Sequence, residues 1–172
     1  APTTSTTMML ALGDAIAIAL LGRRGFSANE FRTLHPGGRL GQAAVVRVAD
    51  IMHTGNAIPL VRPDTGMADT LVEMTSKSLG CAGIVSRDGE LLGIITDGDL
   101  RRHMSPELLR KKCSDVMTTR PRTIRADALA SEALGLMNGV DGQREITSLF
   151  VTHDNRPVGI LHIHDCYRAG VA

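Results

Sequence analysis

The sequence predicts a mixed α/β (α+β) fold made of two copies of one βαββα unit. Two heptapeptides, GIITDGD at residues 93–99 and GILHIHD at residues 159–165, lie sixty-six residues apart and share the pattern Gly-apolar-apolar-polar-x-x-Asp. Upstream of them, VADIM at residues 48–52 and CSDVM at residues 113–117 lie sixty-five residues apart. Motifs that recur in the same order at nearly constant spacing indicate an internal repeat.

Each copy is predicted to begin with a short strand and a helix. In the first copy residues 58–62 form the strand, and Asp64 or Thr65 caps the helix; in the second copy Asp127 is the cap. The apolar residues that recur at helical spacing are Met67, Leu71 and Met74 in the first helix and Ala130, Ala133, Leu134 and Met137 in the second. These faces predict two amphipathic helices.

A hairpin and a final helix complete each copy. The predicted strands are residues 81–86 and 91–96 in the first copy and residues 147–152 and 157–162 in the second. Asp88-Gly89 and Asp154-Asn155 join them, and such pairs favour tight hairpin turns. One three-stranded sheet cannot have both faces covered by its own helices, so we expect the two copies to pack sheet to sheet and leave a cleft between them.

The N-terminal part is predicted to be helical. The apolar stretch Met8–Leu21 is about fourteen residues long and is interrupted by Gly13 and Asp14, whereas spanning a bilayer takes about twenty residues. We therefore expect a buried helix over residues 8–24, closed by Gly25, and no membrane association. A signal peptide is not expected either, since no basic region precedes the apolar stretch.

The predicted N-terminal helix is apolar on nearly every face and so needs partners on all sides. The residues around it offer too few, which predicts either a fragment of a larger protein or burial in an oligomer. Ser27 and Glu30 have capping-box spacing and predict a short second helix. HPGGRLG at residues 35–41 breaks all regularity.

Composition argues against a nucleic-acid partner, a disulfide framework and a metal site. The formal net charge is +1, with 19 basic and 18 acidic residues, and the chain has one Tyr and three Phe; a nucleic-acid-binding surface is therefore not expected. Cys81, Cys113 and Cys166 are odd in number and lack metal-site spacing. They predict a cytoplasmic protein with no disulfide framework and no metal.

The repeated motifs resemble those of tandem cystathionine β-synthase (CBS) domains, a pair also called a Bateman module. The resemblance covers residues 46–172 and implies one CBS domain at 46–108 and a second at 109–172. The preceding residues 1–45, above all HPGGRLG, resemble the end of the sugar-isomerase (SIS) domain in arabinose-5-phosphate isomerases of the KpsF/GutQ type. These enzymes serve the synthesis of Kdo, a sugar of bacterial lipopolysaccharide.

The resemblance implies a role for His35 only in a complete enzyme. There the His of the HPGG segment would act in catalysis as a general acid or base on a carbohydrate derivative. The alternative is a loop His beside a helix end. Most of an SIS domain is missing from this sequence, including its sugar-phosphate loop and carboxylate base, so we expect the chain alone to be inactive as an aldose-ketose isomerase.

Thr96, Asp97 and Asp99 form the first candidate ligand site. Thr96 ends a strand at the start of a helix, where free backbone N–H groups favour a phosphate. In nucleotide-binding CBS domains an Asp placed like Asp99 holds the ribose diol. The alternative, given equal weight, is that Thr96 caps the helix and the two Asp stabilise its first turn.

Two arginines follow in the same predicted helix. Arg101 or Arg102 could clamp a phosphate or carboxylate with two hydrogen bonds. For at least one of them, a solvated helix face is the competing interpretation.

The second copy departs from the CBS pattern, because His162 replaces the Thr and His164 precedes Asp165. Two histidines without a third ligand are weak evidence for a metal, and no metal is expected. The histidines could instead donate hydrogen bonds to an anionic ligand. Because imidazole titrates near neutral pH, affinity would then depend on pH.

The leading prediction is a regulatory module with no cofactor that binds a nucleotide or nucleotide sugar in its cleft. Adenine nucleotides are the general CBS ligands, and CMP-Kdo, as the activated end product, is a specific candidate for allosteric feedback. We expect a homodimer or a higher oligomer. Two alternatives remain open: a fragment that retains isomerase activity, and an assembly module without a ligand.

Overall fold

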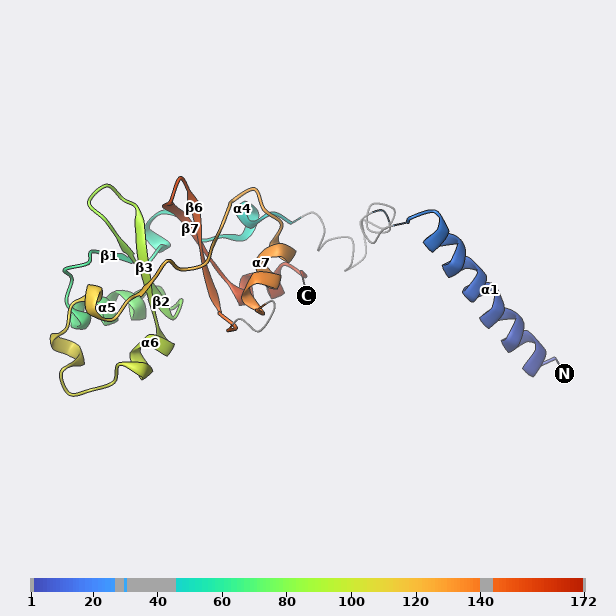
Figure 1. The fold of residues 1–172 in the computed structure, drawn as a ribbon, viewed down its shortest axis with the longest axis horizontal. Coiled ribbons are helices and arrows are strands. Elements are labelled where there is room, and N and C mark those ends of the chain that lie inside the picture. Colours follow the sequence, from blue (N-terminus) through green and yellow to red (C-terminus); the bar gives the residue numbers. More distant parts are fainter. Residues whose placement is uncertain (1, 27–29, 31–45, 140–143, 172) are drawn as a thin grey trace. The chain divides into compact units, whose positions relative to one another are not determined.

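The computed structural model describes residues 2–26, 30, 46–139 and 144–171. The chain divides into two compact units, Ala1–Gln42 and Ala43–Ala172, which we treat separately. The first unit contains helix α1, Thr4–Arg23 (Figure 1). The predicted second helix from Ser27, the HPGGRLG segment and His35 lie outside the described residues.

Helix α1 is longer than predicted. It spans 20 residues because it begins at Thr4, and in its first turn the hydroxyls of Thr6 and Thr7 donate to the carbonyls of Pro2 and Thr3. Its length and mean hydropathy of 1.6 would suffice to cross a membrane, a test that core helices of soluble proteins also pass. The length argument from the sequence was therefore wrong. No residue of α1 is buried, and its burial in a larger protein or an oligomer stays a prediction.

The end of α1 matches the prediction. Gly25 adopts a φ of +65°, and its N–H donates to the carbonyl of Gly22 while the N–H of Phe26 donates to that of Leu21. This pair of bonds is a Schellman motif, which needs a residue with positive φ at the position after the cap.

The second unit contains the two βαββα copies. In the first copy the elements are α4 (Val48–Ile51), η1 (Gly55–Ala57), β1 (Leu60–Val61), α5 (Met67–Lys77), β2 (Cys81–Val85), β3 (Leu91–Thr96) and α6 (Asp97–Arg102). In the second they are η2 (Leu108–Arg110), η3 (Cys113–Asp115), β4 (Thr118–Thr119), β5 (Thr123–Ile124), α7 (Ala130–Met137), β6 (Ser148–His153), β7 (Arg156–His162) and α8 (Ile163–Arg168). The predicted fold class and element order are confirmed.

The strands form two sheets, in the orders β1-β2-β3-β4 and β5-β6-β7. The first strand of each copy runs parallel to the second, and the second pairs antiparallel with the third. Both predicted turns are present: Gly89 has a φ of +84°, and Asp154 and Asn155 have φ values of 48° and 59°. The fourth strand β4 was not predicted, because it comes from the second copy and pairs with β3 of the first.

The predicted helix caps were wrong. Gly66 precedes α5 and Leu129 precedes α7, and neither helix has a side-chain cap. Thr65 instead accepts a hydrogen bond from the N–H of Arg62 at 3.1 Å, and Asp127 pairs with Arg125. These polar side chains lie in the turn that precedes each helix, Thr65 one residue and Asp127 two residues before the cap position.

The two segments that begin the copies, VADIM at residues 48–52 and CSDVM at residues 113–117, each pack on the other copy. Val48 belongs to the core of the second copy, and Cys113 and Val116 belong to the core of the first. A Cβ atom on Gly159 would lie 2.5 Å from the sulfur of Met52, and one on Gly93 would lie 2.8 Å from the sulfur of Met117. The glycine of each heptapeptide is therefore the place where the other copy's methionine fits.

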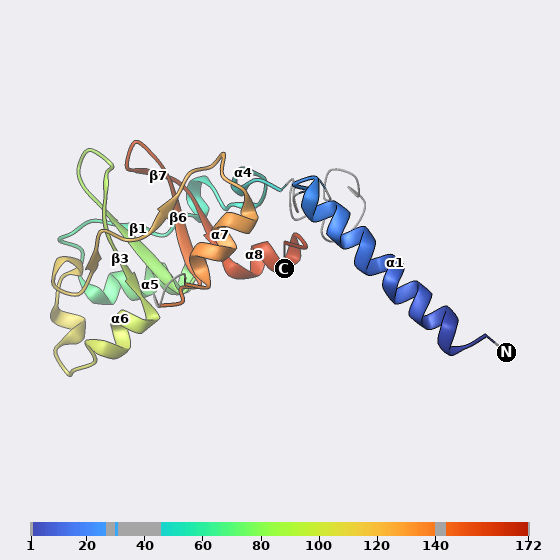
Figure 2. The same cartoon turned by 45° about the vertical axis from the view of Figure 1, so that its right-hand side comes forward.

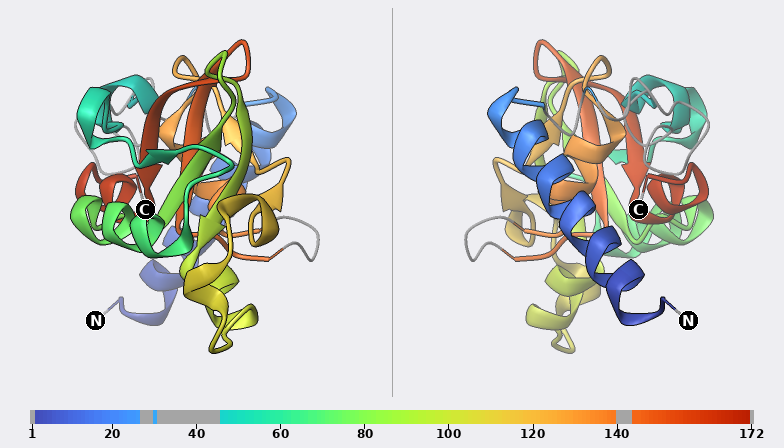
Figure 3. Two further views of the ribbon diagram at one scale, coloured as in Figure 1. Left: turned by 90° about the vertical axis from the view of Figure 1, so that its left-hand side faces the viewer. Right: turned by 90° about the vertical axis from the view of Figure 1, so that its right-hand side faces the viewer.

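The two sheets pack face to face, as predicted. A shared apolar cluster contains Ile58, Leu79, Cys81, Val85 and Leu91 from the first copy and Phe150 and Ile160 from the second. The strands of the two sheets run side by side in Figures 1, 2 and 3. The hairpin tips also meet, because the N–H of Leu91 donates to the carbonyl of Asn155 at 2.8 Å.

Candidate functional site

A cleft of about 820 Å³ lies between the two copies. Its apolar lining residues are Cys81, Ile94, Pro121 and Ile146. Its polar and small lining residues are Gly80, Thr96, Asp97, Gly98, Asp99, Arg101, Arg102, Thr118, Arg120, Arg122, Arg144, Glu145, Thr147 and Ser148. The cleft thus combines apolar surface with many polar groups, and small-molecule sites are concave surfaces that combine the two.

Asp99 is the most highly connected side chain of the cleft. Although it lines the cleft, it is only 2% exposed. The backbone N–H and the hydroxyl of Thr96 donate to its Oδ2 at 2.8 and 2.6 Å, and the hydroxyl of Thr118 donates to its Oδ1 at 2.8 Å. Arg102 also donates to Oδ1. The carboxylate thus ties strand β3, helix α6 and strand β4 together.

This environment keeps Asp99 ionised. Burial by itself raises the pKa of the Asp99 carboxyl, but the hydrogen bonds from Thr96 and Thr118 and the charge of Arg102 outweigh burial, so its pKa lies below the usual value of 3.8. A carboxylate held in this state can only accept hydrogen bonds. It is suited to the hydroxyl groups of a ligand.

Thr96 is the N-cap residue of α6, with an extended backbone and a hydroxyl that accepts from the N–H of Asp99 at 3.3 Å. The N–H of Asp97 donates to the carbonyl of Gly80. Two of the first N–H groups of α6 are therefore already bonded within the protein. The capping role that the sequence left open for Thr96 and Asp99 is present in the structure.

Three more of the predicted site residues line the same cleft: Asp97, Arg101 and Arg102. Arg102 forms an ion pair with Asp99, and its side chain is 49% exposed. The side chain of Arg101 is exposed, and within the described part of the chain it has no hydrogen-bond partner. Arg102 is thus held in place on one side and open to solvent on the other.

His162, His164 and Asp165 occupy the equivalent position in the second copy and do not line this cleft. His162 is the N-cap of α8, and its Nδ1 accepts from the N–H of His164 at 3.3 Å. Asp165 accepts from the N–H of His162 at 3.0 Å and from Arg168 at 2.6 Å. His53 Nε2 lies 3.0 Å from Asp165 Oδ2, at the place where Thr118 meets Asp99 in the first copy.

The surroundings of this site lower the pKa values of both His162 and Asp165. Burial, together with the charge of His164, lowers the pKa of the His162 imidazole below 6.5. Burial raises the pKa of Asp165, but the N–H of His162 and the charges of His53 and Arg168 outweigh it and lower that pKa below 3.8. The neutral ring of His162 is therefore available as an acceptor. Within the described residues, no group of three or more His, Cys, Asp or Glu side chains is placed to hold a metal.

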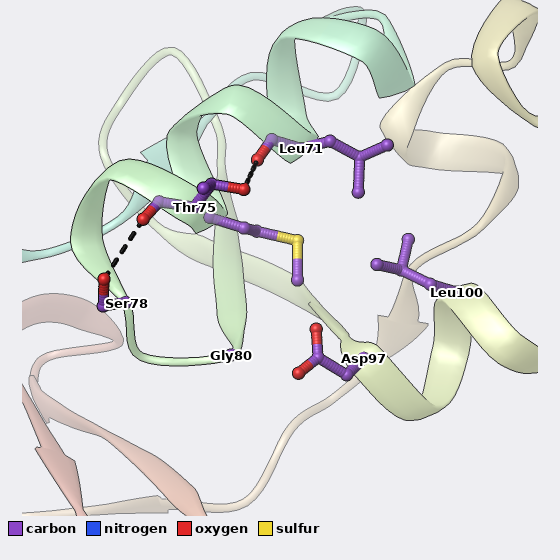
Figure 4. Close-up of a pocket in the computed structure, with 7 residues that line it drawn as sticks. Leu71, Thr75, Ser78, Gly80, Asp97 and Leu100 are labelled. Atoms are coloured by element: carbon purple, nitrogen blue, oxygen red, sulfur yellow. Dashed lines mark hydrogen bonds between the residues drawn. The ribbon is translucent and has the colours of Figure 1, made fainter.

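A smaller hollow of about 370 Å³ lies beside the cleft, between α5 and the start of α6. Figure 4 shows Leu71 and Leu100 facing each other across it, with Asp97 at one end. Gly80 and Asp97 line both this hollow and the cleft. Its lining combines the apolar side chains of Leu71, Met74 and Leu100 with the polar side chains of Thr75, Ser78 and Asp97.

The sequence did not indicate the residues that the second copy contributes to the cleft. Thr118 follows Met117 of CSDVM as His53 follows Met52 of VADIM, and that correspondence could have identified it once the crossing of these segments was known. Nothing in the pattern singles out Arg120, Arg122 or Arg144. They reach the cleft only because the two sheets pack face to face.

Curated relatives match nearly the whole chain. Arabinose 5-phosphate isomerase KdsD of Yersinia pestis is 47% identical over 173 residues, which cover 99% of this chain and 52% of the relative. The protein of the same name from Pseudomonas aeruginosa is 46% identical over 174 residues, again 99% and 52%. The chain thus spans about half the length of the curated relatives it matches.

Solved structures share the fold at low sequence identity. The crystal structure of CBSX2 in complex with AMP has a TM-score of 0.61 and 22% identity, and covers 73% of this chain and 96% of that one. The CBS domain pair of protein MJ0100 in complex with 5′-methylthioadenosine and S-adenosyl-L-methionine has a TM-score of 0.62 and 22% identity, covering 72% and 94%. These likenesses concern the fold.

The CBS domain model matches residues 48–106 and again residues 113–172. These stretches carry the two βαββα copies, the two crossing methionine segments and both helix-capping carboxylates described above. The chain is a member of the CBS domain family and carries a tandem pair of CBS domains.

Proposed function

We propose that this chain is a regulatory module that binds a nucleotide or nucleotide sugar in the cleft between its CBS domains. The observation that carries the proposal is the cleft of about 820 Å³, which joins apolar lining residues to the ionised Asp99 and to arginines from both domains. Its volume is within the range of about 300–1,000 Å³ typical of small-molecule sites. The two CBS structures named above contain AMP in one case and 5′-methylthioadenosine with S-adenosyl-L-methionine in the other, all of them adenosine compounds.

In the proposed complex, Asp99 accepts hydrogen bonds from the ribose diol. Its Oδ1 is shared by Thr118 and Arg102, and the half-exposed Arg102 can turn away to admit the ligand. The phosphate then lies near Thr96, with Arg102 and the exposed Arg101 within the same cleft. Asp97, whose side chain lines both the cleft and the neighbouring hollow, contacts the remainder of the ligand.

We assign the ligand to the half of the module that contains Asp99. In the other half, the His53 ring is hydrogen-bonded to the Asp165 carboxylate, and the backbone N–H of His164 donates to the His162 ring. These contacts stabilise the start of α8, and the three predicted residues do not line the cleft. Their predicted contact with an anionic ligand is a weaker proposal than the Asp99 site.

The relatives suggest the biological setting. We propose that the parent protein is a cytoplasmic arabinose-5-phosphate isomerase of Kdo synthesis, with residues 1–45 at the end of its SIS domain and CBS domains at 46–108 and 109–172. His35 would act only in that enzyme. CMP-Kdo would then be the regulatory ligand, because it combines a ribose for Asp99, a phosphate for the region of Thr96 and a carboxylate for an arginine. Feedback requires that it bind one conformation of the enzyme better than another.

Calorimetric titration with AMP and with CMP-Kdo tests the proposal. Asp99→Ala is expected to weaken binding by about 1.5–3 kcal/mol, the range for a hydrogen bond to a charged group. Asp165→Ala is the matched control, because it removes the same capping carboxylate from the other domain, outside the cleft. Equal affinities for wild type and Asp99→Ala would remove Asp99 from the site, and no binding of either ligand would refute the proposal.

Self-association is a second candidate function, favoured by a surface of α5. Val72 is 70% exposed on this helix, beside the half-buried Leu71. We propose a homodimer or higher oligomer in which this surface is covered. Light scattering at micromolar concentration tests it, and Val72→Lys is expected to shift the chain toward monomer. A rate assay with ribulose 5-phosphate separates both proposals from the remaining alternative, residual isomerase activity.

A further inference from the structure

The cleft receives arginines from both CBS domains. Arg101 and Arg102 come from α6 of the first domain, while Arg120, Arg122 and Arg144 come from the second. The whole chain has a formal net charge of only +1. The cleft is therefore a local concentration of positive charge in an otherwise balanced protein.

Two of these arginines already have partners. Arg102 forms an ion pair with the buried Asp99. Arg122 donates to the carbonyl of Leu136 at 2.8 Å and to the carbonyl of Arg144. These contacts place both guanidinium groups at the wall of the cleft, which they help to shape as well as to charge.

The other three arginines are available to a ligand. Arg101, Arg120 and Arg144 are exposed, and in the ranges that the structure describes none of their side chains forms a hydrogen bond or an ion pair. One comes from the first domain and two come from the second. A guanidinium group is suited to bidentate hydrogen bonds with phosphate or carboxylate.

The carboxylates of the cleft do not cancel this charge. Arg102 already neutralises Asp99, which leaves Asp97 and Glu145 as the other acidic lining residues. Against them stand Arg101, Arg120, Arg144 and the backbone-bound Arg122. A cleft with an excess of one charge concentrates ligands of the opposite charge.

Arg120 has an unusual backbone as well. Its φ is +52°, a left-handed conformation, and it stands between β4 and Pro121. For a residue other than glycine this conformation costs about 1 kcal/mol or more, and a residue before proline also favours an extended backbone. The unusual backbone thus occurs at a residue that lines the cleft.

We propose that the cleft selects a nucleotide that carries at least two anionic groups, one bound by Arg101 of the first domain and the other by Arg120 and Arg144 of the second. Nucleoside diphosphates and nucleotides joined to an acid belong to this class, whereas a nucleoside monophosphate supplies one group and meets only one of the two walls. The proposal rests on the nucleotide site described under Proposed function and specifies its ligand class.

The experiment is a calorimetric series with cytidine, CMP, CDP and CTP, and in parallel with adenosine, AMP, ADP and ATP. CDP or ADP is expected to bind about tenfold more tightly than its monophosphate, as one additional charge-assisted contact would give. In the double variant Arg120→Gln/Arg144→Gln this advantage is expected to disappear while the monophosphate affinity stays within about twofold of wild type. Arg87→Gln is the matched control, since Arg87 is exposed and does not line the cleft.

Three results would contradict the proposal in distinguishable ways. Equal affinity for CMP and CDP, and for AMP and ADP, would overturn the two-anion inference and leave the nucleotide site in place. A diphosphate advantage that survives in the double variant would show that other groups bind the second anion. Absence of binding by all eight compounds and by CMP-Kdo would overturn this inference together with the proposed function. Circular dichroism of each variant establishes that it is folded.

Discussion

The sulfur of Met117 lies 2.8 Å from the position that a Cβ atom on Gly93 would occupy, and the backbone carbonyl oxygen of Thr118 lies 2.9 Å from it. Met117 comes from the second CBS domain and Gly93 from β3 of the first. Gly159 and Met52 repeat the relationship with the domains exchanged. The motifs that repeat along this chain therefore contact each other: the glycine of each heptapeptide meets the methionine from the other domain.

Gly93→Ala is expected to lower the free energy of unfolding by about 1–3 kcal/mol, the usual cost of forcing an extra methyl group into a filled space. The side chain of Met117 can move, but the carbonyl of Thr118 belongs to strand β4 and cannot. Urea denaturation measures the change. Gly135→Ala is the control, because a Cβ at this position in α7 meets nothing within 4 Å; it should raise the stability by up to about 1 kcal/mol through helix propensity. A Gly93→Ala protein as stable as wild type would contradict this account.

Gly83→Ala tests the contact between the two sheets. A Cβ atom on Gly83 would lie 2.6 Å from Cζ of Phe150 in the facing sheet. The substitution alone is expected to cost about 1–3 kcal/mol, and the cost should fall by at least about 0.5 kcal/mol in a Phe150→Leu background, where the ring is absent. A double-mutant cycle by urea denaturation measures this coupling. Strictly additive effects would mean that Phe150 is not what excludes the methyl group.

The capping role of His162 predicts a specific dependence of stability on pH. The pKa of His162 is lowered by folding from 6.5, so its contribution is complete above about pH 6.5 and is lost as the pH falls through the folded pKa. His162→Thr keeps an N-cap acceptor that does not titrate. Thermal melts of both proteins are expected to run parallel from pH 8 to pH 7, after which wild type should lose stability faster down to pH 5. Parallel curves over the whole range would exclude His162 as a source of the pH dependence of stability.

Asp99 and Asp165 should stabilise the protein only when ionised. Because their pKa values are lowered by folding from 3.8, their contribution is present above that pH and is lost as the pH falls through the folded values. Asp99→Asn and Asp165→Asn are each expected to cost about 1–3 kcal/mol at pH 7, and much less at pH 3. Guanidinium denaturation at both pH values checks this. A cost that is the same at pH 3 and pH 7 would show that these contacts do not depend on charge.

The three cysteines are expected to be unreactive in the native state. All three are buried, and burial raises the pKa of Cys81 to about 12 and that of Cys166 to about 11, while that of Cys113 is also raised. Thiolate, the reactive form, is therefore scarce. Ellman's reagent at pH 8 should modify the three thiols only after denaturant is added. Rapid modification of the native protein would show that a cysteine opens to solvent.

Local chemistry in the sequence was sufficient for the repeated architecture. The turn pairs Asp88-Gly89 and Asp154-Asn155 and the strands predicted beside them place both hairpins within one residue of their observed bounds. Gly25 marks the end of α1 because its positive φ is a property of that one residue. The helix starts at Asp64 or Thr65 and at Asp127 were misplaced, since several polar side chains in succession can satisfy either a turn or a cap.

The sequence by itself also determined that Thr96 and Asp99 share one helix start, because residues three apart meet within a single turn. Only the tertiary structure decided what surrounds them. Thr118 reaches Asp99 because CSDVM packs on the opposite domain, and Arg120 and Arg144 enter the cleft because the sheets pack face to face. These partners are 19 or more residues away along the chain. Such contacts follow from burial of apolar surface between the domains, which is non-directional and acts without regard to sequence separation, so the pattern of each element does not reveal which element it will meet.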